Sequence, residues 1–117
     1  MDEKRDIIAE IGGELGSVGW GDLRGVVALT SERDSDGLEY LKMETVLKEF
    51  ERQTGRKSKT VSKSLARATA IIWESGNRDA LREIYHGCLP PCRPMPKSLI
   101  IRLAYFERQR REQRGGV

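Results

Sequence analysis

The sequence contains few of the residues that catalytic and metal sites need. Its 117 residues include one histidine, His86, and two cysteines, Cys88 and Cys92. A catalytic cysteine–histidine pair needs a further group to orient the base, and a structural zinc ion needs four ligands. No paired-carboxylate or metal-ligand pattern stands out. We therefore expect a protein that is not an enzyme and that binds neither a metal nor a cofactor.

The histidine and the two cysteines lie close together in the segment His86–Cys92. This segment is therefore the one candidate for a zinc site. Three residues separate the cysteines, instead of the two of a usual zinc knuckle, and no second knuckle follows. A disulfide is not expected in a cytoplasmic protein. The pattern favours a proline-stiffened loop with two buried or idle thiols.

Long apolar runs and alternating strand patterns are also absent. No run approaches the ~20 apolar residues of a bilayer-spanning helix, and the acidic start Met1–Asp6 is unlike a signal peptide. We expect a cytoplasmic protein with no membrane contact. Apolar residues recur at helical spacing instead, which predicts an all-α fold of about six helices. The expected organisation is one helical domain over residues 1–106 and a basic C-terminal tail over residues 107–117.

The net charge of +3 conceals an asymmetry between the two halves of the chain. Residues 1–54 carry 13 acidic and 7 basic residues, a net charge of −6. Residues 55–117 carry 5 acidic and 14 basic residues, a net charge of +9. The basic half indicates a nucleic acid or another acidic partner, whereas the acidic half argues against polyanion binding over the whole surface.

Three helices are predicted in the acidic half, at residues 2–15, 22–33 and 38 or 42–53. Their inner faces are expected to hold the following side chains: Ile7, Ile8, Ile11, Leu15, Leu23, Val26, Val27, Thr30, Leu41, Val46, Leu47 and Phe50. Asp22 is the predicted N-cap of the second helix, after a glycine-rich connection over residues 16–21 whose Trp20 is expected in the core. The third helix is predicted to end at Thr54-Gly55.

The basic half opens with an amphipathic segment, Arg56–Trp73, which predicts a helix over about residues 58–74. Its apolar stripe contains Val61, Leu65, Ala68 and Ile72. The opposite side gathers Lys59, Lys63, Ala66, Arg67 and Ala70. Ser58 is the expected N-cap, and Gly76 with Asn77 is expected to end the helix. Periodicity alone fits both a solvated surface helix and a DNA recognition helix.

Two further helices complete the predicted fold. Asn77 is expected to cap a fifth helix over residues 78–86, with Leu81, Ile84 and Tyr85 facing inward. Pro96 suits the first turn of a final helix, whose core-facing side chains would be Leu99, Ile100, Leu103 and Phe106. The basic segment Arg108–Arg114 is either a solvated helix end or an accessory phosphate contact.

A helix, a short glycine-containing turn and a second amphipathic helix are together typical of a helix-turn-helix. The third and fourth predicted helices have this arrangement, so the fourth is expected in the major groove of double-stranded DNA with its N-terminal half nearest the bases. Its groove-facing cations would be Lys59, Lys63 and Arg67, and the small side chain of Ala66 is expected on the same side of the helix. Thr60 and Ser62 are expected to contact base edges or phosphates. Arg56 and Lys57 are expected on backbone phosphates, and Ser58 completes the predicted DNA-binding set.

The chain resembles the C-terminal DNA-binding effector domain of the stage-zero sporulation response regulator. The resemblance covers nearly the whole chain, through the segments Asp6–Gly12, Gly19–Arg24, Glu49–Thr54, Ser64–Asn77 and Pro96–Ser98. It is strongest over Ser64–Asn77, where alanine-spaced apolar residues run into Ile72–Asn77, much like the family's Ala-Trp-x-x-Gly-Asn ending. The resemblance implies six helices, a helix-turn-helix made by the third and fourth, and binding to short promoter boxes, often in tandem. Sporulation is implied by this kinship alone.

Three departures limit what the resemblance implies. The family's receiver domain is absent, so its phosphorelay control is not carried over. Ser62-Lys63 and Ala66-Arg67 stand where the family tends to show Glu-Arg and Arg-His, and lysine or alanine does not grip guanine as an arginine does, so a different target box is expected. The loop 33–40 and the basic tail are individual to this chain.

Two functions therefore remain open on the sequence. The first is a DNA-binding transcriptional regulator, with RNA polymerase or another regulator as a further partner and with binding as a dimer or in tandem undecided. The alternative is an adaptor of the same fold that binds a protein regulator and not DNA.

Overall fold

The computed structural model describes residues 7–11, 17–32 and 42–115, and these ranges contain six helices and no strand. The helices are α1 (Ile7–Ile11), α2 (Ser17–Ser31), α3 (Met43–Thr54), α4 (Ser58–Ser75), α5 (Arg78–Ile84) and α6 (Pro96–Gly115). The prediction of an all-α fold with six helices is confirmed. None of the described helices has both the length and the apolar character that a membrane crossing requires.

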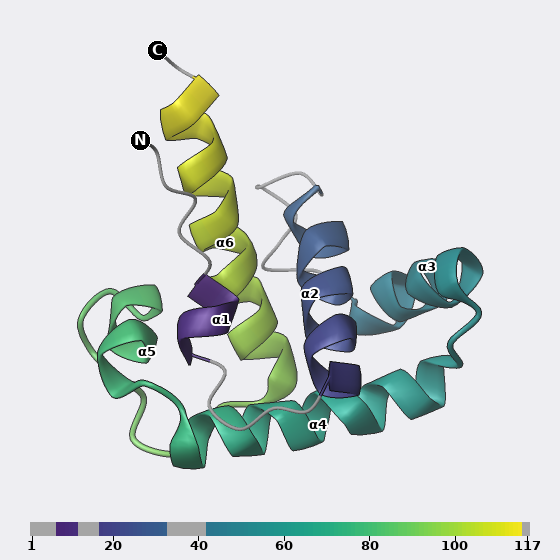
Figure 1. Cartoon of the computed structure of the whole chain (residues 1–117), viewed down its shortest axis with the longest axis horizontal. Helices are drawn as coiled ribbons and strands as arrows, with labels where there is room; N and C mark the ends of the chain where they lie inside the picture. Colours follow the sequence, from purple (N-terminus) through teal and green to yellow (C-terminus); the bar gives the residue numbers. More distant parts are fainter. Residues whose placement is uncertain (1–6, 12–16, 33–41, 116–117) are drawn as a thin grey trace.

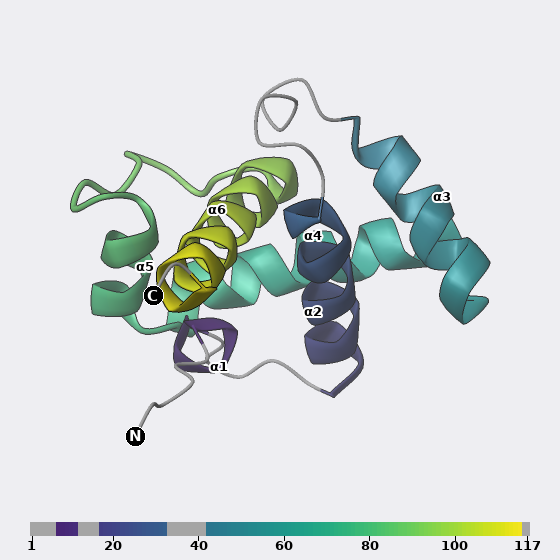
Figure 2. The same ribbon diagram turned by 90° about the horizontal axis from the view of Figure 1, so that it is seen from above.

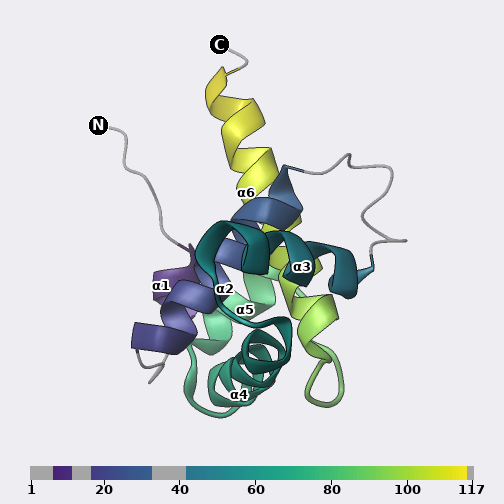
Figure 3. The same ribbon diagram turned by 90° about the vertical axis from the view of Figure 1, so that its right-hand side faces the viewer.

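The long helix α4 forms one edge of the molecule (Figure 1). α2 and α6 rise side by side from it, α3 lies beyond α2, and α1 and α5 lie at the other end (Figures 1 and 2). α2 packs against α3, α4 and α6. Seen along its axis, α4 lies at the bottom of the molecule with α3 above it (Figure 3). One long side of α4 therefore faces away from the other helices.

The core consists of the apolar stripes that helical spacing predicts. Each of the six helices contributes buried side chains to one cluster, and the members with no more than 1% exposure include Ile7, Ile11, Leu23, Val26, Val46, Val61, Ile72, Leu81, Leu99, Ile100 and Leu103. Phe106 is partly buried against this cluster. Burial at helical intervals on every helix stabilises the fold because it removes apolar surface from water.

Three predicted helix ends are also confirmed. α3 ends at Gly55, whose φ of 80° lies in the left-handed region and whose N–H donates to the carbonyl of Glu51. The side chain of Asn77 caps α5 by accepting from the N–H groups of Asp79 and Ala80. Pro96 is the first residue of α6.

The predicted start of the second helix is wrong. α2 begins at Ser17, so Asp22 lies within the helix and is buried instead of capping it. Packing of α2 against three neighbouring helices offsets the low helix propensity of its glycines. Trp20 is not a core residue as predicted, because it is half-buried and its ring stacks with the guanidinium of Arg24 at 4.2 Å.

The end of α5 differs from prediction as well. α5 ends at Ile84, two residues earlier than expected, and His86 and Gly87 adopt positive φ beyond it. Cys88 and Cys92 are free and both exposed, so neither thiol is buried. α6 continues as a helix to Gly115, and the division into a domain over residues 1–106 and a tail over residues 107–117 stays a prediction. The predicted inner residues Leu15 and Leu41, the connection at Gly16 and the loop 33–40 lie outside the described residues.

Gly76 marks a point of close backbone approach between α1 and α4. A Cβ at this position would overlap the carbonyl oxygen of Ile11 and would lie 2.6 Å from that of Ile72. Both obstacles are backbone atoms at helix ends, which cannot turn aside as a flexible side chain can. Gly76 is therefore needed for packing as well as for ending α4.

We expect Gly76→Ala to destabilise the protein by about 1–3 kcal/mol, because the new methyl group forces two helix ends apart. Gly21→Ala is the matched control, since a Cβ at Gly21 of α2 meets no atom within 4 Å. That change should stabilise the protein by about 0.5–1 kcal/mol through helix propensity. Urea unfolding followed by circular dichroism measures both, and equal effects of the two substitutions would contradict the packing role of Gly76.

Candidate nucleic-acid interface

The side of α4 that faces away from the other helices carries most of the residues predicted to bind DNA. Lys59, Thr60, Ser62, Lys63, Ala66 and Arg67 are all exposed. Their apolar counterparts Val61, Leu65, Ala68 and Ile72 are buried on the opposite side, as predicted. Ala70, predicted on the outer face, is half-buried. The sequence therefore predicted both faces of α4 correctly except at this margin.

The charge of this outer face is of one sign. Glu74, in the last turn, is the sole acidic residue of α4, and the first turn contains none. Cations near a helix N-terminus are disfavoured by the helix dipole, so Lys57 and Lys59 occupy positions that helix stability alone would not select. The small side chain of Ala66 lies among the cations and leaves room for close approach. A phosphate or another anion would relieve the unfavourable charge at this end of the helix.

The N-terminus of α4 is held by α3. Ser58 is the first residue of the helix and not its N-cap as predicted, because Lys57 occupies the cap position without a side-chain hydrogen bond. The Ser58 backbone N–H donates to Glu51 Oε1 at 3.0 Å, and the Ser58 hydroxyl donates to the same oxygen at 2.9 Å. The carboxylate of Glu51 thus satisfies a free first-turn N–H of α4 from the preceding helix.

Glu51 is therefore ionised, and its carboxylate holds the first turn of α4. The hydrogen bonds from the Ser58 hydroxyl and N–H lower the pKa of Glu51 below its ordinary value of 4.5 because they stabilise the carboxylate, and the charge of nearby Lys57 acts in the same direction.

The turn between α3 and α4 is tied to α2 by an ion pair. Arg56 Nε donates to Asp22 Oδ1 at 2.9 Å, and Arg56 Nη2 donates to Asp22 Oδ2 at 2.6 Å. Asp22 is 2% exposed, whereas the Arg56 side chain is 36% exposed. Two parallel hydrogen bonds fix the guanidinium in one orientation. The pair therefore sets where α4 begins relative to α2.

Arg56 and Ser58 thus have partners inside the protein. Both were predicted among the DNA-binding residues, and that contact stays a prediction. Asp22 and Glu51, which hold them, were missed. Glu51 could have been found from its position seven residues before Ser58, across a turn that brings the two together. The pairing of Asp22 with Arg56 spans 34 residues and leaves no periodic signal in the sequence.

The cations of the basic half fall into two groups: those whose side chains contact other groups of the protein, and those whose side chains make no such contact. Arg56 pairs with Asp22, Arg82 with Asp79, and Arg108 donates to the carbonyl of Ser31 at the end of α2. Arg78 and Arg102 stack on the rings of Trp73 and Tyr85. Arg108, expected to be solvated or on phosphate, therefore contacts the last turn of α2, where a cation is favoured by the helix dipole.

The other cations of residues 55–109, the part of this half whose side chains the structure describes, are exposed. In the described part of the chain, no ion pair, hydrogen bond or ring contact involves the side chains of Lys59, Lys63, Arg67, Arg93 and Lys97. Lys57 is also exposed and lies close enough to Glu51 to lower its pKa. Three of the five cations without such a contact line the outer side of α4, so the positive charge gathers where the helix is accessible.

The outer side of α3 has a different character. Its cations are neutralised within the helix, because Lys48 pairs with Glu44 and Arg52 pairs with Glu49. Exposed pairs of this kind contribute little to stability, but they leave α3 without a free positive face. α3 thus offers a duplex fewer cations than α4 does.

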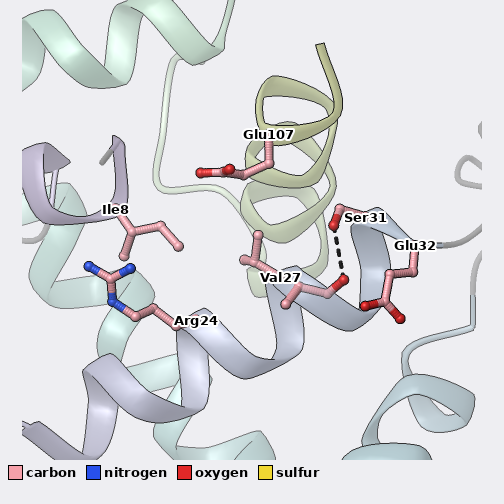
Figure 4. A pocket seen from close by; sticks show the side chains of 7 residues that line it. Ile8, Arg24, Val27, Ser31, Glu32 and Glu107 are labelled. Atoms are coloured by element: carbon pink, nitrogen blue, oxygen red, sulfur yellow. Dashed lines mark hydrogen bonds between the residues drawn. The ribbon is translucent and has the colours of Figure 1, made fainter. Parts of the chain in front are cut away.

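A hollow of about 380 Å³ lies elsewhere, between α1, α2 and α6. Arg24 and Glu107 reach toward it from different elements, and Ile8 and Val27 supply apolar surface (Figure 4). The Ser31 hydroxyl beside it donates to the carbonyl of Ala28. The lining mixes both signs of charge, so this hollow does not extend the cationic surface of α4.

Comparisons with protein-family models, with curated proteins and with solved structures found no match to this chain. The resemblance to the sporulation regulator's effector domain, and with it the helix-turn-helix, stays a prediction.

We expect the two partners of the Asp22–Arg56 pair to respond unequally to substitution. Arg56→Met leaves a buried carboxylate without its cation, whereas Asp22→Asn keeps one acceptor and frees a guanidinium that already reaches water. Arg56→Met should therefore lower the urea midpoint of unfolding more than Asp22→Asn does. No change in either midpoint would show that this pair does not hold the turn, and equal losses would contradict the unequal cost expected from burial of the carboxylate.

We expect Glu51 to contribute less to stability in acid. Since its pKa is lower in the folded than in the unfolded protein, its contribution is complete above about pH 4.5 and is lost as the pH falls through the folded value. Carboxyl titration by NMR should show Glu51 ionised below pH 4.5 and its pKa raised by Ser58→Ala. Ser62→Ala, on the same helix but exposed, is the control that should leave Glu51 unchanged.

Proposed function

We propose that this protein is a transcriptional regulator that binds double-stranded DNA with α4 in the major groove. The observation that carries the proposal is the exposed outer side of α4, where Lys59, Lys63 and Arg67 face solvent with no acidic neighbour between residues 58 and 73. Electrostatic attraction to phosphates supplies most of the affinity of proteins for DNA, and an α-helix fits the major groove. Accessible charge of one sign on a long helix is what such binding needs.

We assign each residue on the outer side of α4 a role in binding DNA. Lys59, Lys63 and Arg67 face the groove, and Arg67 is the one among them whose planar guanidinium presents a fixed fork of donors to guanine O6 and N7. Thr60 and Ser62 reach base edges or phosphates. Ala66 lets the helix axis come close to the base pairs, and Lys57 neutralises a backbone phosphate.

Arg56 and Ser58 act differently from what the sequence predicted. Since Arg56 is held by Asp22 and Ser58 by Glu51, we assign them the task of fixing the N-terminal end of α4. An N-terminal half that is held in place costs less entropy on binding than one that becomes ordered in the groove. The proposed recognition surface is therefore preorganised from two sides.

In the proposal α3, the turn Gly55–Lys57 and α4 act as a helix-turn-helix, with α3 across the phosphate backbone. The three-residue connection and the glycine at the end of α3 support this arrangement. The resemblance to the sporulation regulator's effector domain supports it further, and the residues on the outer side of α4 imply a different target box. RNA polymerase or a second regulator, and a dimer or tandem arrangement on DNA, belong to the same proposal.

We expect Lys63→Ala combined with Arg67→Ala to weaken DNA binding by about tenfold or more at low salt, because two groove-facing cations are lost. If the wild-type protein neutralises about five phosphates, log affinity falls with log salt at a slope of about −4 to −5. The double variant should reduce this slope by up to about 2. Fluorescence anisotropy with a labelled duplex at several salt concentrations measures both quantities.

The matched control is Arg78→Ala combined with Arg82→Ala, which also removes two cations but from α5, where both have internal partners. This control should leave the salt slope nearly unchanged. If the variant on α4 and the control lower the affinity equally, net charge and not the face of α4 determines binding, and the proposal is wrong.

An adaptor that binds a protein regulator is the second candidate. It is favoured by the outer side of α3, whose ion pairs leave no free positive face for a phosphate backbone. Retention on heparin and on DNA columns at low salt separates the two. A protein that flows through both columns, and that binds a purified regulator through α3, would favour the adaptor.

A further inference from the structure

The proline-rich connection between α5 and α6 lies beside α4. Residues 86–95 leave the top of α5, pass the C-terminal half of α4 and lead into α6, whose first turns contact α4 (Figures 1 and 3). Viewed along α4, this connection reaches the same edge of the molecule as the outer side of α4 (Figure 3). A long ligand on that side of α4 would therefore meet the connection as well.

The connection is fixed at both ends. Gly87 N–H donates to the carbonyl of Arg82 at 2.7 Å, and Cys88 N–H donates to that of Tyr85 at 3.2 Å. Leu89 packs against the core, and the hydroxyl groups of Tyr85 and Ser98 lie 3.3 Å apart, which links the start of the connection to the first turn of α6.

Proline content stiffens the same segment. Pro90, Pro91, Pro94 and Pro96 each fix one backbone dihedral angle, so this stretch has few conformations to lose on binding. A side chain carried here is therefore presented at a defined place.

Arg93 of the connection and Lys97 of the adjoining first turn of α6 make no contact inside the described part of the protein. Arg93 and Lys97 are exposed, and no ion pair, hydrogen bond or ring contact involves either side chain in the described part of the chain. Their neighbours Arg82 and Arg102 are engaged by Asp79 and by the ring of Tyr85. Lys97 also stands in the first turn of α6, which has no acidic residue and where the helix dipole disfavours a cation. No contact within the described part of the protein accounts for these two charges.

We infer that Arg93 and Lys97 form a second phosphate-binding element, which contacts the backbone of the same duplex that α4 enters. This inference rests on the proposed function and extends it. The segment offers cations on a stiff support and few groups that read base edges, so it should add affinity and fix the orientation of the protein without adding sequence preference. Its partner is the phosphate backbone of double-stranded DNA.

The test compares Arg93→Ala combined with Lys97→Ala against two controls, using the full chain and a labelled duplex at several salt concentrations. Losing two phosphate contacts should reduce the salt slope by about 2 and weaken binding to unrelated duplexes to the same degree. Exchanging the two cations, Arg93→Lys with Lys97→Arg, keeps both charges and should retain the slope. Arg78→Ala with Arg82→Ala removes two internally engaged cations and should also retain it.

The outcomes separate this inference from the proposed function. If the variant of Arg93 and Lys97 keeps the full slope while the variant of Lys63 and Arg67 reduces it, the inference is overturned and the proposed function stands. If the wild-type chain binds no duplex at low salt, both are overturned. A loss confined to one duplex sequence would assign these residues to base reading and would also contradict the inference.

Cys88 and Cys92 provide a second readout that does not depend on substitution. They are the two cysteines of the chain, and both thiols are free and exposed in the same connection. A bound duplex should slow the alkylation of Cys92 by a bulky maleimide at least severalfold, because the DNA backbone covers the segment. Equal alkylation rates with and without saturating DNA would overturn the inference even if α4 binds the duplex.

Discussion

The buried carboxylate of Asp22 is the constraint on which the arrangement of this protein depends. An aspartate that is 2% exposed needs a cation, and Arg56 supplies it through two hydrogen bonds from the turn before α4. Because Asp22 lies within the central helix α2, this pair places the start of α4 against the core. Glu51 then holds the first turn of α4 from the side of α3. Both acidic residues belong to the acidic half of the chain, and both serve to fix the first helix of the basic half.

Helical periodicity predicted most of the fold because burial follows it closely. The stripe of α4 with Val61 and Leu65 and the stripe of α6 with Leu99 and Leu103 are buried as expected. The start of α2 was predicted wrongly from local helix propensity, because the glycines within residues 17–21 disfavour a helix. The neighbouring helices nevertheless stabilise this part of α2. The partner of Asp22 could not be predicted, because no local rule connects residues 34 positions apart. Ser58 was misjudged for a related reason, since its carboxylate partner comes from another helix.

The positive net charge says less about function than the contacts of each cation do, because only cations without an internal partner are available to a ligand. Several arginines of the basic half make contacts inside the protein. Arg78 and Arg102 stack on aromatic rings, and Arg108 donates a hydrogen bond to the end of α2. Among the described side chains of residues 55–109, what remains is a set of cations on the outer side of α4 and at Arg93 and Lys97. The sequence predicted the first group from its helical spacing. It could not relate the second group to the first, because only the fold brings α6 beside α4.

The central claim is that the outer side of α4 binds double-stranded DNA with a sequence preference. Selection of bound duplexes from a random pool by the purified protein tests it most directly, because retention and preference are read from the same experiment. We expect low-salt selection to retain duplexes and to enrich a short common box, and we expect the enrichment to be lost when Lys63 and Arg67 are replaced by alanine. Failure to retain any duplex at low salt, or enrichment that survives this double substitution, would contradict the account.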